Sequence, residues 1–468
     1  METNQIIERG KDNRRKDTAR CFVKVLDIIM LAIPFVLVWF LYYEQRTPNS
    51  TAFTSIALIL LFLCLYVFFS KTYDALLISY KRISELFTGQ VLASLLADTV
   101  MFLILIAMTG KFPNILPALG TIIVQWILAL VWCVFAHRWY FKHNPAKKTA
   151  VVYDVRPYEG LVEEYGLSKK FDVQKILTAT EVLNDLSLLE GMDAVFFSGV
   201  HSHDRNVILK YCIDNGIRTL IIPRIGDVIM GNAKRMHLFH LPILQVERAK
   251  PRFGYAVLKR FFDILLSLVL ILVTSPIMII VAIAVKSDGG PALYKQVRLT
   301  LDGKEFKILK FRSMCVDAEK ITGAVLSSGE NDPRITKIGR IIRACRVDEL
   351  PQLFNILKGE MSIVGPRPER PEIAAEYEKE MPEFRLRLQV KAGLTGYAQV
   401  YGKYNTEPYD KLNMDLMYIA EASIIEDLKI IFATVFILFS KDSTEGITTG
   451  NGTAILENPA DFCARRVF

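Results

Sequence analysis

The residues best suited to chemistry are two adjacent carboxylates, Asp348 and Glu349, in an arginine-rich segment. Arg340, Arg343 and Arg346 precede the pair at intervals of three residues. Adjacent carboxylates surrounded by cations can divide the work of phosphoryl transfer, because one can attack phosphorus while the other binds a divalent metal that neutralises a diphosphate. Magnesium suits such a site, since it is a hard cation with oxygen ligands. An acidic pair alone is common on protein surfaces, so this interpretation depends on the surrounding sequence.

Two neighbouring segments add cations that could contact phosphate. In the strand-like segment EFKILKFRSM, the two-residue period of a strand places Lys310 and Arg312 on one face. In the turn VGPRPER, Arg367 stands between Pro366 and Pro368, whose fixed φ angles stiffen the backbone. All six histidines precede this part of the chain, so its acid, base or nucleophile must be another residue type.

The overall composition indicates a membrane protein with additional domains outside the bilayer. Of the 468 residues, 51% are hydrophobic, which is too apolar for an ordinary soluble protein of this length. The net charge of +8 suits contact with anionic lipid and phosphorylated substrates, and charge alone would equally allow nucleic acid. The seven cysteines are scattered without a CxxC pair, which favours reduced thiols facing the cytosol.

Four apolar stretches predict a transmembrane domain over residues 1–145. They cover residues 21–43, 51–70, 91–109 and 117–141. Each can form a helix of about 20 residues, which crosses the ~30 Å hydrocarbon layer. Basic residues gather before the first stretch, between the second and third, and after the fourth. The positive-inside rule therefore places the N-terminus and everything after residue 142 in the cytoplasm.

Residues 146–248 have the pattern of a small Rossmann-like domain. Short β-rich segments alternate with helical ones, which predicts a doubly wound parallel sheet. The first strand runs into DVRPYEGLVEEYG, which lacks the G-x-G-x-x-G fingerprint for a pyrophosphate. We therefore expect a structural or regulatory module here, not a dinucleotide site.

A further apolar run at residues 261–285 opens the C-terminal domain, residues 249–468. Ser275 and Pro276 lie near its middle, where proline removes a backbone donor and breaks or bends a helix. Basic residues flank both ends, so a full crossing would leave one cationic flank outside. A re-entrant helical hairpin that enters and leaves on the cytoplasmic face fits both observations; the alternative is a kinked fifth spanning helix.

The start of this run carries charges at helical spacing. Lys259, Asp263 and Ser267 share one helical face, and Arg260 precedes Asp263 by three residues. A carboxylate near a bilayer needs a partner, so we expect an ion pair of Asp263 with Lys259 or Arg260 that anchors the helix. The alternative is that these cations hold the phosphate of a lipid. Residues 428–439, too few to span, are expected to form an interfacial helix that lies on the membrane; the alternative is a core helix.

The ordered motifs KRxxDxxxS, a central Ser-Pro, GGP, KFRSM, DELPQLFN, MSIVGPRPER and GLTGYAQV resemble the monotopic phosphoglycosyltransferase superfamily of bacterial sugar transferases. The likeness covers about Lys259 to Thr434. With four spanning helices and the sheet domain, the chain is similar to the large members that initiate exopolysaccharide, capsule or O-antigen synthesis. The resemblance implies a membrane α plus α/β fold with a mixed α/β catalytic domain.

The family's activity, if shared, is transfer of a sugar 1-phosphate from a UDP-sugar to polyprenol (undecaprenyl) phosphate, giving polyprenol-diphosphate-sugar and UMP. By resemblance, Asp348 is the nucleophile that forms a covalent phosphosugar intermediate, and Glu349 is the Mg²⁺ ligand. Lys310, Arg343 and Arg367 fall on family positions that bind phosphate and nucleotide.

Two further residue sets complete the expected site. The predicted substrate-binding set also includes Arg312, Pro366 and Pro368. The re-entrant helix is matched by Lys259, Arg260, Asp263, Ser275 and Pro276.

The expected partners are a UDP-sugar, polyprenol phosphate and the membrane, with a homodimer left open and no nucleic acid. The expected location is the bacterial cytoplasmic (inner) membrane, multi-pass, with the catalytic domain on the cytoplasmic face. The sugar and the pathway cannot be read from the sequence. A non-catalytic scaffold or regulator of polysaccharide assembly is the alternative function.

Overall fold

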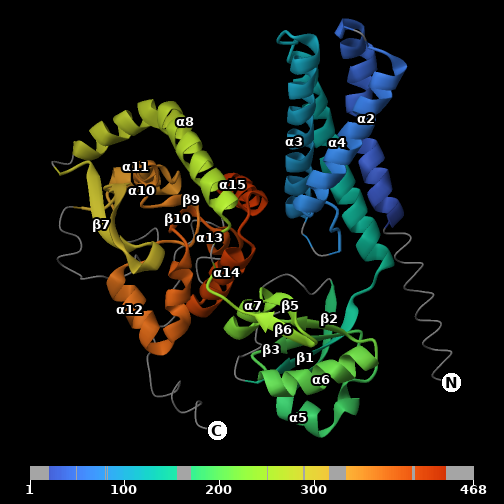
Figure 1. Ribbon diagram of the computed structural model, residues 1–468, viewed down its shortest axis with the longest axis vertical. Coiled ribbons are helices and arrows are strands. Elements are labelled where there is room, and N and C mark those ends of the chain that lie inside the picture. Colours follow the sequence, from blue (N-terminus) through green and yellow to red (C-terminus); the bar gives the residue numbers. More distant parts are fainter. Residues whose placement is uncertain are drawn as a thin grey trace. The chain divides into compact units, whose positions relative to one another are not determined.

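The computed structural model describes residues 21–48, 50–79, 81, 83–154, 170–249, 251–287, 290–315, 334–402 and 406–438. The chain divides into two compact units, one ending at Ile221 and the other beginning at Ile222. Figure 1 shows the helices and strands of both units.

The first unit contains four helices that are long and apolar enough to cross a membrane. These are the helix Cys21–Arg46, α2 (Ala52–Thr72), α3 (Ile83–Thr109) and α4 (Leu116–His143). The first of them ends in a π-helical turn, Trp39–Tyr43, and a 3-10 turn, Glu44–Arg46. Large apolar side chains point outward, as with Phe53 at 81% exposure, which is what lipid-facing surfaces require. All four predicted membrane stretches are therefore helical, and the protein is a membrane protein.

The parallel sheet predicted for the next part of the chain is confirmed. Its strands are β1 (Lys147–Tyr153), β2 (Phe171–Thr178), β3 (Ala194–Ser198) and β4 (Arg218–Ile221), in the order β2-β1-β3-β4 and all parallel. Helices α5 (Ala179–Asn184) and α6 (Ser202–Asp214), with the 3-10 turn Leu186–Leu189, connect them. The segment that lacks the glycine fingerprint falls largely at 155–169, outside the described residues.

The second unit combines helices with short pairs of strands. Its helices are α7 (Ile225–Gly231), α8 (Phe253–Lys286), α10 (Lys337–Ala344), α11 (Gln352–Lys358), α12 (Pro371–Glu380), α13 (Tyr397–Tyr401), α14 (Pro408–Glu421) and α15 (Ile424–Leu438). Its 3-10 turns are Leu301–Gly303, Val347–Glu349 and Pro382–Gln389. Its antiparallel strand pairs are β5 (Lys234–Leu238) with β6 (Leu241–Gln245) and β7 (Leu293–Leu299) with β8 (Glu305–Phe311). The parallel pair is β9 (Ser362–Val364) with β10 (Gly393–Thr395).

One apolar core holds the second unit together. Leu353, Ile356, Met361, Leu412 and Ile430 are fully buried in it. They come from α11, the start of β9, α14 and α15, so elements far apart in sequence pack on one another. Burial of Ile430 shows that α15 packs on this core as well as exposing apolar side chains such as Val435. The mixed α/β character expected of this domain is confirmed.

The predicted helical hairpin takes a different form. Residues Phe253–Lys286 make one uninterrupted helix, α8, with Pro276 inside it, and Figure 1 shows that this helix bends. Pro276 has no N–H to donate to the carbonyl of Leu272. The hydroxyl of Ser275 donates to that carbonyl instead, at 2.9 Å. The distortion predicted at Ser275 and Pro276 therefore lies inside one continuous helix, and the re-entrant path of this helix stays a prediction.

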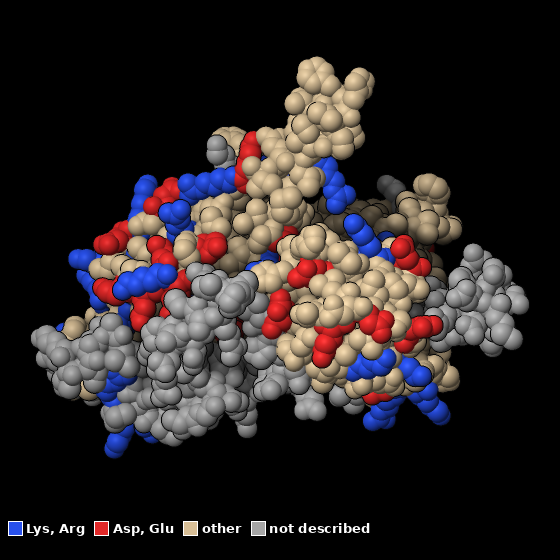
Figure 2. Space-filling model, turned by 90° about the horizontal axis from the view of Figure 1, so that it is seen from below, with Lys and Arg blue, Asp and Glu red and all other residues tan. Residues whose placement is uncertain are grey.

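Charge is mixed on the face of the molecule seen in Figure 2. Lysine and arginine side chains are interspersed there with aspartate and glutamate, among the residues that the view describes.

Candidate active site

The two adjacent carboxylates lie in a tight turn between two helices. Asp348 and Glu349 end the 3-10 turn Val347–Glu349, which is followed by α11. Arg346, immediately before the turn, has a left-handed backbone with φ of 56°. A non-glycine residue in this region is uncommon and marks a backbone that its surroundings hold in place. The pair is therefore presented by a constrained turn.

Two cations from other elements meet at Glu349. The Lys310 ammonium, on β8, donates to Glu349 Oε1 at 2.7 Å. Arg367 Nη2 lies 3.7 Å from the same oxygen. Burial would raise the pKa of Glu349, but the charges of Lys310 and Arg367 outweigh it and lower that pKa to about 2. Glu349 is therefore a carboxylate at any physiological pH.

Asp348 has the opposite electrostatic setting. Burial and the charge of Glu349 raise its pKa to about 6, against the opposing influence of Lys310, Arg343 and Arg346. Its Oδ1 atom is buried and accepts no hydrogen bond from the described part of the chain. Adjacent acids with pKa values pushed apart can take different chemical roles. A raised pKa and a buried Oδ1 without a hydrogen bond from the described residues distinguish Asp348 from Glu349.

The oxygen donors at this pair fit a magnesium ion. No group of three or more His, Cys, Asp or Glu side chains that could hold a metal occurs among the described residues. Magnesium needs fewer, because it commonly binds through one or two carboxylates and completes its shell with water and substrate phosphates. Ionised Glu349 could supply such an oxygen.

The proline-flanked turn that carries Arg367 is fixed by close backbone packing. Gly365 N–H donates to the carbonyl of Thr395, and Gly393 N–H donates to that of Pro366, both at 2.9 Å. A Cβ atom on Gly365 would lie 2.3 Å from the carbonyl oxygen of Lys391. Only glycine permits this approach of β9 to β10. The stiff turn expected from its prolines is thus anchored by a glycine contact as well.

Two arginines that the sequence did not single out support the same turn. Arg387 Nη2 donates to the carbonyl of Arg367 at 2.9 Å, and Arg298 Nη1 donates to that of Pro368 at 3.1 Å. Both arginines lie near Glu369, at 3.7 and 3.8 Å, and Arg387 pairs with buried Asp415 at 2.7 Å. Buried cations of this kind remain only where carboxylates compensate them. No local pattern reveals them, since the partners are separated by 20 to 70 residues.

The structure places Arg312 away from the carboxylate pair. Its guanidinium donates to the carbonyls of Pro291 at 3.0 Å and of Val285 at 2.8 Å, and it is 7% exposed. Val285 lies in the last turn of α8, where unpaired carbonyls attract cations. The two-residue period predicted one face for Lys310 and Arg312, but β8 ends at Phe311 and the Arg312 donors bind the end of α8.

The charged residues at the start of α8 find partners other than those expected. Lys259 Nζ lies 2.8 Å from Asp427 Oδ2. Arg260 donates at 2.7 and 2.8 Å to two carbonyls at the end of α11. Asp263 Oδ1 accepts from the Ile363 N–H at 3.0 Å and from a serine hydroxyl. The predicted direct ion pair of Asp263 with Lys259 or Arg260 is therefore not formed in the described structure, because backbone donors satisfy this carboxylate.

The second unit of this chain is similar to known proteins. Residues 254–441 match the bacterial sugar transferase family. An uncharacterized sugar transferase of Haemophilus influenzae is 35% identical over 255 residues, which cover 51% of this chain and 54% of that protein. A UDP-glucose:undecaprenyl-phosphate glucose-1-phosphate transferase of Escherichia coli K12 is 43% identical over 230 residues, which cover 48% and 49%. The chain thus spans about half the length of these two relatives.

A shorter relative is covered almost completely. The exopolysaccharide production protein PSS of Rhizobium leguminosarum bv. phaseoli is 44% identical over 190 residues, which cover 38% of this chain and 94% of that protein. The carboxylate pair lies within residues 254–441, the part that matches the family. This chain belongs to the bacterial sugar transferase family, as its motifs indicated.

Proposed function

We propose that this protein transfers a sugar 1-phosphate from a UDP-sugar to polyprenol (undecaprenyl) phosphate, as the first membrane step of surface polysaccharide synthesis. The observation that carries the proposal is the carboxylate pair. Asp348 has an oxygen without a hydrogen bond from the described residues. The neighbouring Glu349 lies against the cations of Lys310 and Arg367. The name of the Escherichia coli relative describes this reaction with glucose. The sugar used by this chain is left open.

In the first half of the proposed reaction, a carboxylate oxygen of Asp348 attacks the sugar-bearing phosphorus of the UDP-sugar. A phosphorus–oxygen bond to Asp348 forms as the bond between the two phosphates breaks, and its electron pair leaves with UMP. Lys310 and Arg367, which already face Glu349, stand where they can hold phosphate oxygens. The product is an acyl phosphate that carries the sugar.

In the second half, a phosphate oxygen of the polyprenol phosphate attacks the same phosphorus. The bond to Asp348 breaks, the carboxylate is restored, and polyprenol-diphosphate-sugar forms, so no oxidant or further reactant is needed. Glu349, with Asp348 beside it, would hold Mg²⁺, which when bound neutralises the charge of the diphosphate. The constrained turn keeps Asp348 in one place through both steps.

We propose further that α8 is re-entrant and that the second unit lies on the cytoplasmic face of the bacterial inner membrane. Both ends of α8 pack on this unit, since Arg260 binds α11 near one end and Arg312 binds the Val285 carbonyl at the other. The bend carries exposed apolar side chains such as Leu272, 75% exposed. A domain on one side of a bilayer can contact both ends of α8 only if the helix leaves the bilayer on the side from which it entered. Cysteines placed on either flank should then both react from the cytoplasm.

The rate of UMP release should fall in acid. Asp348 attacks only as a carboxylate, and its pKa is raised to about 6. Below that value the ionised fraction, and with it the rate, falls about tenfold per pH unit. Glu349 stays ionised at these pH values, so its titration adds no second fall in the rate. The measurement is the initial UMP burst as a function of pH, with recovery at neutral pH as a check on folding. A burst unchanged one unit below that pKa would exclude this role for Asp348.

Replacing Lys310 with methionine should lower the rate of the initial UMP burst. It should also shift the pH below which that rate falls. The variant loses a charge-assisted hydrogen bond, so the expected drop at neutral pH is about 10- to 100-fold. The Lys310 charge lowers the pKa of Asp348. Without that charge the pKa should rise, so the burst rate should begin to fall at a higher pH. Lys307→Met is the matched control, since Lys307 is exposed on the same strand. Equal profiles for the two variants would contradict the assignment.

The proposal as a whole is tested by product formation. The purified full chain is incubated with Mg²⁺, polyprenol phosphate and a panel of UDP-sugars, and UMP is measured. Release with at least one sugar is expected, and the sugar that supports it identifies the substrate. Failure with every UDP-sugar would favour the alternative of a non-catalytic scaffold or regulator.

A further inference from the structure

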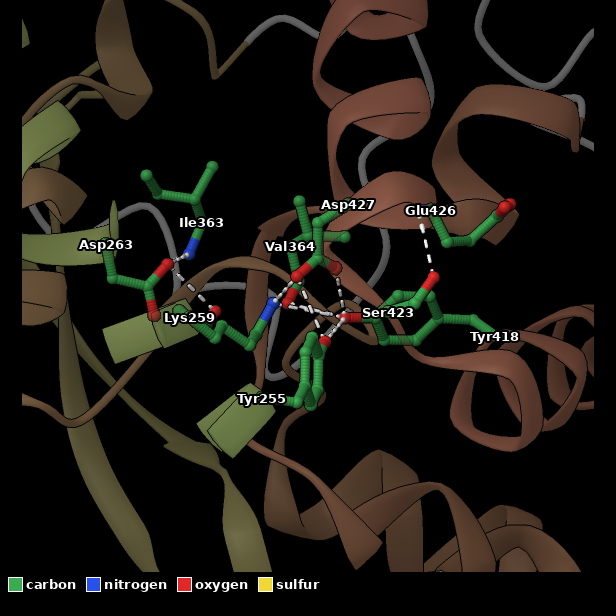
Figure 3. A network of polar contacts seen from close by, with 10 residues as sticks. Tyr255, Lys259, Asp263, Ile363, Val364, Tyr418, Ser423, Glu426 and Asp427 are labelled. Carbon is green, nitrogen blue, oxygen red and sulfur yellow. Dashed lines mark hydrogen bonds and ion pairs between the residues drawn. The ribbon is translucent and has the colours of Figure 1, made fainter. Parts of the chain in front are cut away.

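A second buried polar cluster lies apart from the carboxylate pair, at the contact between the membrane helix and α15. We call it the α8–α15 junction: Tyr255 and Lys259 of α8, Tyr418 of α14 and Asp427 of α15 (Figure 3). Asp427 Oδ2 accepts from Lys259 Nζ at 2.8 Å and from the Tyr255 hydroxyl at 3.0 Å. Its Oδ1 accepts from the Tyr418 hydroxyl at 2.7 Å. One carboxylate therefore joins three helices.

The charges of the junction are largely shielded from water. The side chains of Lys259 and Asp427 are 18% and 9% exposed. Apolar side chains of the same two helices are exposed beside them, including Leu258 at 44% and Ile425 at 44%. A shielded pair is little screened by salt, and removing one partner leaves a buried charge uncompensated. The junction therefore holds α8 against α15 in a defined arrangement.

The same stretch of α8 also holds the elements that build the active site. Asp263 binds the backbone of β9 through Ile363, and β9 leads directly into the turn that carries Arg367. Arg260 binds the end of α11, the helix that follows the carboxylate pair. The position of α8 in the membrane therefore determines where the site stands relative to lipid.

We propose that Asp427 is a positioning residue that sets the depth of the active site at the membrane. Through Lys259 and Tyr255 it fixes α8 against α15, and so fixes where the carboxylate pair meets the phosphate of the lipid acceptor. This rests on the proposed function, because the lipid acceptor belongs to it. The UDP-sugar half-reaction needs only the pair and its cations, whereas the lipid half-reaction also needs the correct depth.

The test compares Asp427→Asn with Glu426→Gln. Glu426 is the neighbouring carboxylate on α15, but it pairs with Lys429 at 3.1 Å and points away from Lys259 (Figure 3). Asp427→Asn should raise the KM for polyprenol phosphate at least about tenfold, as expected when a buried charge loses its partner. It should leave the UMP burst without lipid within about twofold of wild type, because the chemical groups are intact. Glu426→Gln should change neither quantity.

A double variant covers the case in which Asp427→Asn does not fold. Tyr255→Phe with Tyr418→Phe removes two hydrogen bonds to Asp427 and leaves every charge in place. Because Asp427 then keeps Lys259 alone, this variant should show a normal burst and a raised KM for the lipid. A burst that falls together with the lipid step would indicate a general structural role and overturn the proposal.

A reactivity measurement keeps the junction testable without catalysis. Ser267 is completely buried on the same face of α8, so Ser267→Cys reports whether the helix lifts away. In vesicles, N-ethylmaleimide should label this cysteine faster when Asp427→Asn is added than when Glu426→Gln is added. Labelling is read at residue 267 by peptide mass spectrometry, because native cysteines such as Cys345 are also exposed. Equal labelling rates would overturn the proposal. If the wild-type chain released no UMP, the proposed function would fail, while this comparison would still decide whether Asp427 holds α8 against α15.

Discussion

Replacing Asp348 with asparagine should abolish sugar-phosphate transfer, with a loss of at least about a thousandfold in UMP release, as for other covalent nucleophiles. The amide has nearly the shape of the carboxyl group, but it cannot form the acyl phosphate. The fold should persist, because asparagine removes a buried carboxylate whose pKa is raised by burial and by Glu349. Stability should therefore be unchanged or improved, as measured by the unfolding temperature in detergent.

The matched control for this prediction is Glu305→Gln. Glu305 is an exposed carboxylate on β8, the strand that also carries Lys310, so it reports any effect of losing an acidic side chain there. Its activity should stay within about twofold of wild type, since surface changes away from such features have small effects. UMP release by a well-folded Asp348→Asn variant at the wild-type rate would rule out a covalent intermediate on Asp348.

Local signals explain what the sequence could predict. Each membrane helix was visible as an uninterrupted apolar run, and the parallel sheet was visible as alternating strand and helix segments. The carboxylate pair was visible because Asp348 and Glu349 are adjacent, so their proximity needed no tertiary information. The two prolines beside Arg367 predicted a stiff turn, and the structure brings Arg367 to 3.7 Å from Glu349.

Long-range partners explain what the sequence could not predict. Asp427 lies 168 residues after Lys259, and its neighbour Glu426 is an equally acidic candidate at the start of α15. Asp263 had two cations within one helical turn, yet it binds a backbone N–H 100 residues away. Helical spacing shows which side chains share a face, but the partner is decided by how the face packs. The same limit applies to Arg387, whose acceptor is a carbonyl that no sequence pattern marks.

Replacing Gly365 with alanine should reduce UMP release by about a hundredfold, because misplacing a binding group by 1 Å can cost that much. The added Cβ would lie 2.3 Å from the Lys391 carbonyl oxygen, and that oxygen belongs to the backbone and cannot rotate away. The strands β9 and β10 must then separate by about 1 Å to reach ordinary van der Waals contact. Since β9 leads into the turn, Arg367 moves with it.

The effect should appear mainly as a raised KM for the UDP-sugar, because the displaced group binds substrate whereas Asp348 stays in its own turn. Gly226→Ala is the control: Gly226 lies within helix α7 of the same unit, and a Cβ there would meet no atom within 4 Å. That substitution should leave activity unchanged and slightly favour the helix. An equal loss in both variants would point to a general destabilisation. An unchanged KM in a folded Gly365→Ala variant would mean that the β9–β10 contact does not position Arg367.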